Sequence, residues 1–282
     1  MPEISVIVSS FDGSRAGNVP RLLEDVRKQT LQDAELIVVT GVSPNGKARN
    51  EGIRKTRGKF LIFLDDDVRL GHKKVFENLL KFLETDAAVG MTGGSIRVPK
   101  DANNFMRRLG QELPRWQVPI AASPEESDVV TTACCAVPRA VVEKTGLFHE
   151  GLRRGVDPEF RARLRKAGYK IILVPDTYFF HPLPNTLKAL AAFSYKRGVA
   201  AAYGQRYYPK LRFEVPPAGK DIRYERRSLL FRLLRKGGTL LACLLTLKWL
   251  RLSDELCYGM GFFVFYAQTL FKAEKPNDTE TA

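Results

Sequence analysis

The sequence predicts an α/β fold in which a mostly parallel sheet is covered by helices on both faces. Short apolar runs rich in β-branched residues alternate with segments whose apolar residues recur at helical spacing. Such alternation is typical of βαβ units, whose strands are parallel. The runs over residues 4–9 and 59–64 are apolar almost throughout, and strands with this composition are buried on both faces. The first part of the chain therefore forms a layered domain around one sheet.

The separate elements follow from the same periodicities. The helix expected over residues 19–29 places Val19, Leu22 and Val26 on one face. The expected strands cover residues 4–9, 35–40, 59–64 and 171–174, and the expected helices cover residues 19–29, a stretch ending at Ile53, 75–83 and 157–166. Residues 97–130 carry four prolines, and we expect a long functional loop or several short elements there.

The last third of the sequence differs from the rest in charge. Between Pro182 and Arg251 there are 15 Lys and Arg residues against three acidic ones, within a chain of net charge +14. We therefore expect two parts, an α/β domain over residues 1–182 and a basic, apolar helical tail over residues 183–282. A basic block beside apolar runs indicates an anionic membrane surface or another polyanion as partner. A nucleic acid is the competing partner, and a solvated basic surface is the alternative without a ligand.

The tail has the pattern of helices that lie on a membrane. Its apolar runs, residues 237–247 and 256–271, are shorter than the roughly 20 residues of a comfortable bilayer span. Before them, Leu229, Leu230, Leu233 and Leu234 stand beside Arg232, Arg235 and Lys236, a pattern typical of a headgroup-level helix. Packing on the first domain and a homodimer through the tail are the alternatives. The start of the chain has no secretory pattern, so we expect a cytoplasmic protein, peripheral at the inner face of the cell membrane.

Three adjacent aspartates follow the third apolar strand. Asp65, Asp66 and Asp67 stand at its carboxyl end, the edge at which open α/β sheets bind ligands. Their charges repel one another unless a cation is bound, and hard carboxylate oxygens suit Mg²⁺ or Mn²⁺. In an extended chain Asp65 and Asp67 point to one side and Asp66 to the other. A solvated acidic turn is the alternative interpretation.

Several segments resemble those of family 2 glycosyltransferases. The stretch A-R-N-E-G-I-R-K-T-R-G-K-F-L-I-F-L-D-D-D-V (residues 48–68) is similar to the core signature of the family, and I-S-V-I-V-S-S-F-D (residues 4–12) to its first strand and nucleotide-binding loop. Further on, G-L-F-H-E-G-L (residues 146–152) and V-D-P-E-F-R-A-R-L-R-K-A-G-Y-K (residues 156–170) resemble its acceptor-side segment and base-bearing helix. The resemblance covers about residues 3–181. It implies the GT-A fold, a single nucleotide-binding α/β domain, here followed by a C-terminal helical amphipathic segment.

The resemblance also implies roles for particular residues. Asp67 would ligate the Mn²⁺ or Mg²⁺ that bridges the donor diphosphate, and Asp65 or Asp66 would contact the ribose. Arg49 would lie near the donor. His181 would complete the metal shell, although a lone histidine after an apolar strand is more often structural. The nucleoside pocket would be lined by the residues that end and follow the first strand, namely Ser9, Ser10, Phe11 and Asp12.

Asp157 has two interpretations. Followed by Pro158, it fits the N-cap of a helix. The resemblance makes it the general base of an inverting transfer, and one carboxylate can serve both purposes. The Glu-Asp pair of the family has become Val156-Asp157, which leaves Glu159 as the nearest second carboxylate. Thr40 stands where the second strand of the family usually ends in a base-contacting Asp, so the identity of the nucleotide stays open.

Together these motifs predict an inverting, metal-dependent glycosyltransferase. It would move a sugar from a UDP-, GDP- or dTDP-sugar to a membrane-associated acceptor, lipid-linked or a cell-envelope glycan. A nucleotidyltransferase stays open as an alternative, although S-S-F-D-G-S-R-A-G is a weak version of the Gly-rich basic loop that would hold a triphosphate. A non-catalytic basic protein is the other alternative, and it would bind nucleic acid in a salt-dependent way. Nucleic acid is the less expected partner.

Overall fold

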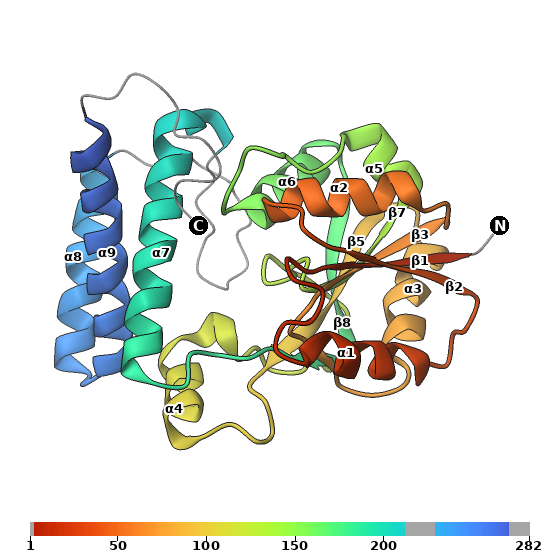
Figure 1. The fold of residues 1–282 in the computed structure, drawn as a ribbon, viewed down its shortest axis with the longest axis horizontal. Helices are drawn as coiled ribbons and strands as arrows, with labels where there is room; N and C mark the ends of the chain where they lie inside the picture. Colours follow the sequence, from red (N-terminus) through yellow and green to blue (C-terminus); the bar gives the residue numbers. More distant parts are fainter. Residues whose placement is uncertain (1–2, 212–228, 271–282) are drawn as a thin grey trace. The chain divides into compact units, whose positions relative to one another are not determined.

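The computed structural model describes residues 3–211 and 229–270, and these divide into two compact units. The α/β unit comprises residues 3–151 and 156–183 of the described chain, and the helical unit comprises residues 152–155, 184–211 and 229–270. Figure 1 shows the sheet of the first unit and the long helices of the second.

The α/β unit is built on a mixed sheet with the strand order β2–β1–β3–β7–β5–β8–β4, and β6 pairs with β8. β1 lies between β2 and β3 and is parallel to both, and β5 is parallel to β8. Antiparallel β7 joins these two groups through β3 and β5. The strands are β1 (Ile4–Ser9), β2 (Ala34–Val39), β3 (Phe60–Asp65), β4 (Arg69–Leu70), β5 (Val89–Arg97), β6 (Glu125–Glu126), β7 (Cys134–Pro138) and β8 (Lys170–Phe180).

Helices cover both faces of this sheet. α2, α5 and α6 lie on one face and α1 and α3 on the other (Figure 1). On α3 the side chains of Leu79, Leu80 and Leu83 are buried, and full burial of a leucine stabilises a fold by about 1.5–3 kcal/mol. The helices are α1 (Asn18–Arg27), α2 (Asn45–Lys55), α3 (Val75–Thr85), α4 (Asn104–Glu112), α5 (Arg139–Thr145) and α6 (Val156–Lys166), with a 3-10 turn at Pro114–Trp116.

The sheet differs from the expected one in three places. The apolar run over residues 35–40 was also expected to form a buried strand, but the corresponding β2 is the edge strand and most of its side chains are partly exposed. The expected strand 171–174 is part of the longer β8, which continues through Pro175 and Asp176. β5 and β7 had no counterpart among the expected strands. The proline-rich stretch 97–130 does contain short elements, α4 and β6 among them.

The helical unit consists of α7 (Leu187–Tyr207), α8 (Leu229–Leu245) and α9 (Trp249–Thr269) in its described part. α7 and α9 approach so closely that a Cβ on Gly198 would lie 2.0 Å from the Tyr258 carbonyl oxygen, and one on Gly261 would lie 2.1 Å from that of Tyr195. Real Cβ atoms do not approach carbonyl oxygens this closely. Glycine at both positions therefore permits the backbones to touch.

Polar and aromatic contacts fix the same helix pair. Asp254 of α9 is buried, and it accepts hydrogen bonds from Ser194 and, at 2.7 Å, from Arg197 of α7. Tyr203 and Phe265 form a buried cluster with Ala202. Breaking a buried pair by removing one partner is costly because it leaves an uncompensated charge. No helix in the described ranges is long and apolar enough to cross a bilayer.

Candidate functional site

The carboxyl ends of β1 and β3 form the edge at which the predicted site residues gather. The two strands pair in register, so Ser9 stands beside Asp65. The chain then leaves β1 through Ser10, whose N–H donates to the Val39 carbonyl at 3.0 Å and whose Oγ accepts from Gly13 N–H at 3.1 Å. This edge therefore brings the loop after β1 next to the aspartates after β3.

Asp12 shapes that loop. Its Oδ1 accepts the backbone N–H groups of Ser14 at 2.8 Å and Arg15 at 2.6 Å, and these two hydrogen bonds, that of Arg15 first, lower the pKa of Asp12. Arg15 has a positive φ of 46°, which is unfavourable for a residue with a Cβ. Phe11 is 70% exposed beside this turn. Of the expected pocket residues, Ser9 and Ser10 are buried, Phe11 is open to solvent, and Asp12 is engaged by the loop itself.

The three aspartates do not continue the strand. β3 ends at Asp65, and Asp66 and Asp67 form a turn in which Val68 N–H donates to the Asp65 carbonyl at 3.4 Å. The backbone is therefore not extended across the three aspartates, as the expected alternation of Asp65, Asp66 and Asp67 had assumed. Instead, Arg15 lies 3.9 Å from Asp66 Oδ1 and 3.1 Å from Asp67 Oδ2, and Asp65 faces another partner.

That partner is Arg49, the buried arginine of the A-R-N segment on α2. Its Nη2 donates to Asp65 Oδ1 at 2.8 Å, and its Nη1 lies 4.0 Å from Asp157 Oδ1. Its guanidinium also lies 5.8 Å from the centre of the Phe148 ring. One buried cation thus links the carboxylate that ends β3 to the candidate base on α6.

Asp157 lies inside the first turn of α6, which begins at Val156. The N-cap interpretation was therefore wrong, because the N-cap position lies two residues earlier, and the hydrogen bond that Asp157 Oδ1 accepts comes from the hydroxyl of Thr132. Glu159, the nearest second carboxylate, is buried and accepts from Arg163 at 2.6 Å and 3.0 Å. Asp157 is thus positioned by tertiary contacts, whereas Glu159 is committed to an ion pair on its own helix.

Asp67 and His181, the two residues expected to hold the metal ion, lie close together. Asp67 Oδ1 is buried and has no hydrogen-bond partner in the described structure, and His181 Nε2 lies 3.6 Å from it. The other ring nitrogen, Nδ1, lies 2.9 Å from the Pro182 carbonyl. A donor bond there leaves Nε2 unprotonated, the form in which imidazole binds metals. The described residues contain no group of three or more His, Cys, Asp or Glu side chains suited to an ion, so further ligands would come from elsewhere. The residues present fit a cation completed by oxygens of a bound ligand.

Burial changes the acidity of the two aspartates beside Asp67. Removal from water raises the pKa of Asp65, against the lowering effect of Arg49. It also raises the pKa of Asp66, against the hydrogen bond of Ser10 and the charge of Arg15. Neighbouring negative charges add to both shifts. A cation at this turn would relieve the repulsion that the folded chain imposes here.

Two residues of this site were not found from the sequence. Arg15 stands in a Gly- and Ser-containing loop, where nothing in the pattern distinguishes it from a solvated charge. Thr132 precedes β7, and that strand was not expected. The signal that could have found Thr132 is its position just before the apolar run of β7, since an antiparallel neighbour of β3 begins at the edge where β3 ends.

The fold and this edge define a nucleotide-binding α/β domain of the GT-A type. The sequence model of the family described as Glycosyltransferase like family 2 matches residues 2–197. The chain belongs to this family, and the resemblance seen in its motifs is confirmed.

Individual proteins agree with this assignment. Glycosyltransferase AglE of Haloferax volcanii is 24% identical over 211 residues, which cover 64% of this chain and 67% of that protein. The mannosyltransferase PcManGT from Pyrobaculum calidifontis, solved in complex with GDP-Man and Mn²⁺, superposes with a TM-score of 0.57 and 17% identity over 97% of this chain and 88% of its own. GalNAc-T7, solved with UDP, GalNAc and Mn²⁺, superposes with a TM-score of 0.51 and 16% identity over 95% of this chain and 57% of its own. These likenesses confirm the expected GT-A fold. Its membership of the family makes the chain a glycosyltransferase.

Proposed function

We propose that this glycosyltransferase is inverting and depends on Mn²⁺ or Mg²⁺. It moves a sugar from a nucleotide-sugar donor to a lipid-linked or glycan acceptor at an anionic membrane surface. The observation that carries the proposal is the link from Asp65 through Arg49 to Asp157, together with the turn that presents Asp67. A donor-side carboxylate and a candidate base from distant parts of the chain meet at one edge.

Asp157 has the contacts of a general base. Its carboxylate is partly exposed, so an acceptor hydroxyl can reach it, and Thr132 and Arg49 restrict its orientation. In a single displacement, Asp157 takes the proton of the acceptor hydroxyl while the acceptor oxygen attacks the anomeric carbon from the face opposite the leaving group. The configuration of the sugar is thereby inverted.

The donor side would be held by residues of the loop after β1 and of the turn after β3. Asp67 and His181 would hold the metal ion, which when bound neutralises charge on the departing nucleoside diphosphate. Asp65 or Asp66 would accept hydrogen bonds from the ribose, and the exposed Phe11 offers its ring to the base. PcManGT was solved with GDP-Man and GalNAc-T7 with UDP. This chain has Thr40 where a base-contacting acid was expected, so its nucleotide is not fixed by the motif. UDP, GDP and dTDP are therefore all included in the binding experiment.

The helical unit supports a location at a membrane surface. Large apolar side chains on α8, on α9 and in the link between them are exposed to solvent, among them Leu245, Leu247 and Phe263. Exposed apolar residues beside basic ones are typical of helices that lie at the headgroup level of anionic membranes. The side chains of Leu229, Leu230, Arg232 and Leu233, on which part of this expectation rested, lie outside the described residues.

The decisive experiment measures binding of UDP, GDP and dTDP by calorimetry, with and without Mn²⁺. We expect one of them to bind the wild-type chain in a Mn²⁺-dependent way, and Asp67→Ala to lose that dependence. Asp33→Ala removes an exposed carboxylate from the loop before β2, so it should behave as the wild type. Nucleotide binding that is unchanged in Asp67→Ala would overturn the metal assignment.

The products distinguish the remaining reaction classes. With the matching sugar nucleotide, we expect release of the nucleoside diphosphate and a product whose anomeric configuration is opposite to that of the donor, as measured by NMR. Retention of configuration would contradict the role of Asp157. Release of pyrophosphate from a nucleoside triphosphate would instead indicate nucleotidyl transfer.

A further inference from the structure

Thr132 has a buried hydroxyl group that meets the candidate base. The side chain of Thr132 is fully buried, and its Oγ1 is hydrogen-bonded to Asp157 Oδ1. Because an ionised carboxylate can only accept hydrogen bonds, the hydroxyl is the donor. Within the described chain, this is the one hydrogen bond that the Asp157 carboxylate makes. The orientation of the base thus depends on a single hydroxyl group and on the nearby charge of Arg49.

Both of these groups act on the same carboxylate oxygen. Arg49 Nη1 lies 4.0 Å from Asp157 Oδ1, the oxygen that also accepts from Thr132. Oδ2 is left without a hydrogen bond from any residue that the structure describes. The Asp157 side chain is 27% exposed, so a ligand can reach its carboxylate. One oxygen of Asp157 is therefore held by the protein, and the other is available to an acceptor.

The backbone on each side of Thr132 is anchored. The carbonyl of Ala133 accepts from Asp65 N–H at 3.1 Å, which ties this turn to the end of β3. The carbonyl of Val130 accepts from the buried Arg161, which stands on α6 one turn after the candidate base. The segment before β7 is thus bound both to the sheet and to the helix that carries the base. Its hydroxyl is presented from a backbone held at two points.

The neighbouring Thr131 offers a comparison within the same segment. Its hydroxyl is also buried but has no hydrogen-bond partner in the part of the chain that the structure describes. Valine in place of either threonine keeps the branched shape of the side chain and removes only the hydroxyl. The two substitutions therefore separate the contact with Asp157 from the packing of the segment.

We propose that Thr132 is the positioning residue of the general base, and that its bond to Oδ1 directs Oδ2 of Asp157 at the acceptor hydroxyl. In the transfer, the acceptor O–H bond breaks and its proton goes to Oδ2, while the acceptor oxygen bonds to the anomeric carbon. The bond from that carbon to the diphosphate oxygen breaks, and its electron pair leaves with the nucleoside diphosphate. The inference rests on the proposed inverting transfer, within which it assigns this role.

The contact itself is tested without turnover, by urea unfolding of the full chain. The cycle comprises the wild type, Thr132→Val, Asp157→Ala and the double variant. We expect the two changes to be non-additive by a factor of about 10 in the unfolding equilibrium constant, as for one hydrogen bond to a partly exposed carboxylate. With Thr131→Val in place of Thr132→Val, the changes should be additive. Additive changes in both cycles would overturn the contact and with it the inference.

The role in the reaction is tested with the sugar nucleotide whose nucleotide binds in calorimetry and with water as acceptor, by the rate of nucleoside diphosphate release. Thr132→Val should lower kcat by about 10–100-fold at an unchanged KM for the donor, because small errors of position cost up to about 10²-fold. Thr132→Ser keeps the hydroxyl and should restore most of the rate. Added to Asp157→Asn, Thr132→Val should cost little more, since the two residues act as a unit. An equal cost in both backgrounds would overturn the positioning role.

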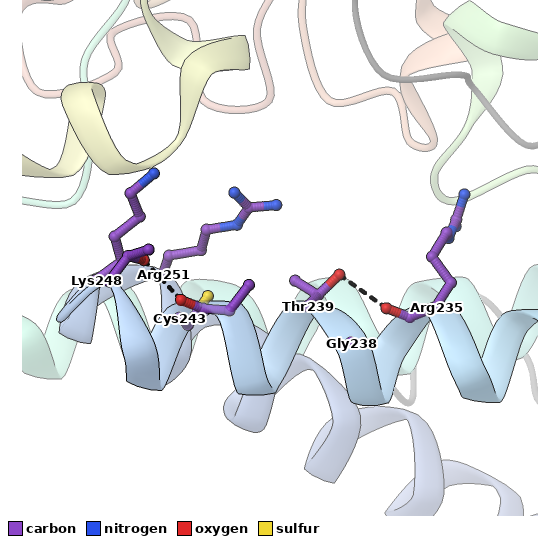
Figure 2. Close-up of a pocket in the computed structure, with 8 residues that line it drawn as sticks. Arg235, Gly238, Thr239, Cys243, Lys248 and Arg251 are labelled. Atoms are coloured by element: carbon purple, nitrogen blue, oxygen red, sulfur yellow. Dashed lines mark hydrogen bonds between the residues drawn. The ribbon is translucent and has the colours of Figure 1, made fainter.

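Two further threonine variants are controls for the loss of a hydroxyl group. Thr131→Val should keep the wild-type rate. In the helical unit, Thr239 Oγ1 donates at 2.9 Å to the carbonyl of Arg235, one turn earlier on α8 (Figure 2). Thr239→Val therefore removes a hydroxyl that makes a hydrogen bond outside the proposed site, and it should also keep the wild-type rate. A loss in either control as large as that of Thr132→Val would contradict the inference.

The inference and the proposed function fail in different ways. A rate that falls in Asp157→Asn but not in Thr132→Val would overturn the role of Thr132 and leave the proposed base in place. A wild-type rate in Asp157→Asn would overturn the proposed base, and the non-additivity in unfolding would then mean only a structural contact. Mn²⁺-dependent nucleotide binding, measured on the same samples, should be the same in every variant of Thr132.

Discussion

The guanidinium of Arg15 lies 3.1 Å from Asp67 Oδ2, where the proposed metal site would need a free carboxylate. The loop that carries Arg15 reaches this place with a positive φ at both Arg15 and Ala16. The arginine side chain is 54% exposed, so the ion pair stabilises the fold by little. Its effect is on the site itself, because it keeps a positive charge beside the turn of aspartates.

Removal of that charge should strengthen metal binding. In Arg15→Gln, we expect the Kd of Mn²⁺, measured without nucleotide, to fall by about fivefold, since two unit charges about 4 Å apart interact by about 1 kcal/mol in water. Arg21→Gln removes a charge of the same sign from α1, where Arg21 bonds to Asn18. Calorimetry on both variants checks this, and an equal gain in the control would mean that net charge, not the contact with Asp67, sets the affinity.

Asp157→Asn should lower the transfer rate by about 10²–10⁴-fold, because an amide cannot accept the proton of the acceptor. Donor affinity and the melting temperature should stay near the wild-type values, since an amide oxygen can still accept from Thr132. The control is Glu159→Gln on the same helix, whose carboxylate pairs with Arg163. It should destabilise the fold but leave the transfer rate per folded molecule unchanged. A wild-type rate in Asp157→Asn would rule out the role of base.

Asp66 should make the metal-free protein less stable as the pH rises. Its folded-state pKa is raised by burial, so stabilisation that is present below the unfolded-state pKa of about 3.9 is lost as the pH rises through the folded-state pKa. In Asp66→Asn this loss disappears. The free energy of unfolding of the variant, minus that of the wild type, should therefore increase from pH 4 to pH 7, as measured by urea unfolding in EDTA.

Asp86 supplies a control of opposite sign for that measurement. The backbone N–H of Ala88 is the main cause that lowers the pKa of Asp86, so its stabilising effect is present above the unfolded-state pKa. For Asp86→Asn, the free energy of unfolding of the variant minus that of the wild type should therefore decrease as the pH rises. If this difference changed in the same direction in both variants, burial would not be the cause of the raised pKa of Asp66.

Gly198→Ala should destabilise the helical unit. The new Cβ would meet the Tyr258 carbonyl oxygen at 2.0 Å, so the helices must move apart, at a cost of about 1–3 kcal/mol. Gly259→Ala on α9 is the matched control, because its Cβ would enter open space. It should stabilise the helix by up to about 1 kcal/mol. Denaturant unfolding followed by circular dichroism compares the two, and equal stabilities would mean that the crossing of α7 and α9 adapts.

The parts of the fold that could be predicted are those in which composition and periodicity agree. β1 and β3 are short apolar runs, and α1 and α3 have one apolar face each. β5 was missed because its sequence V-G-M-T-G-G-S-I-R has the composition of a turn. Tertiary packing requires glycine in this strand, since a Cβ on Gly93 would lie 2.5 Å from the Val130 side chain. Local pattern cannot show such an approach.

The site was predictable where it depended on strand ends and on family motifs. Asp65 ends β3 as expected, but Asp66 and Asp67 form a turn, because backbone after a strand need not stay extended. The approach of His181 to Asp67 brings together residues of β3's turn and the end of β8, and no spacing in the sequence encodes that distance. Arg49 was named only by resemblance, whereas the structure supplies the reason, which is its contact with Asp65 and its proximity to Asp157.

The pair of glycines at the crossing of α7 and α9 also constrains how this chain can diverge. Replacing either Gly198 of α7 or Gly261 of α9 would force the two helices apart. Once one is lost and the helices separate, the second no longer has a reason to remain glycine. The two positions should therefore vary together among relatives, and chains that lack a counterpart of α9 should be free to place a larger residue at the position of Gly198.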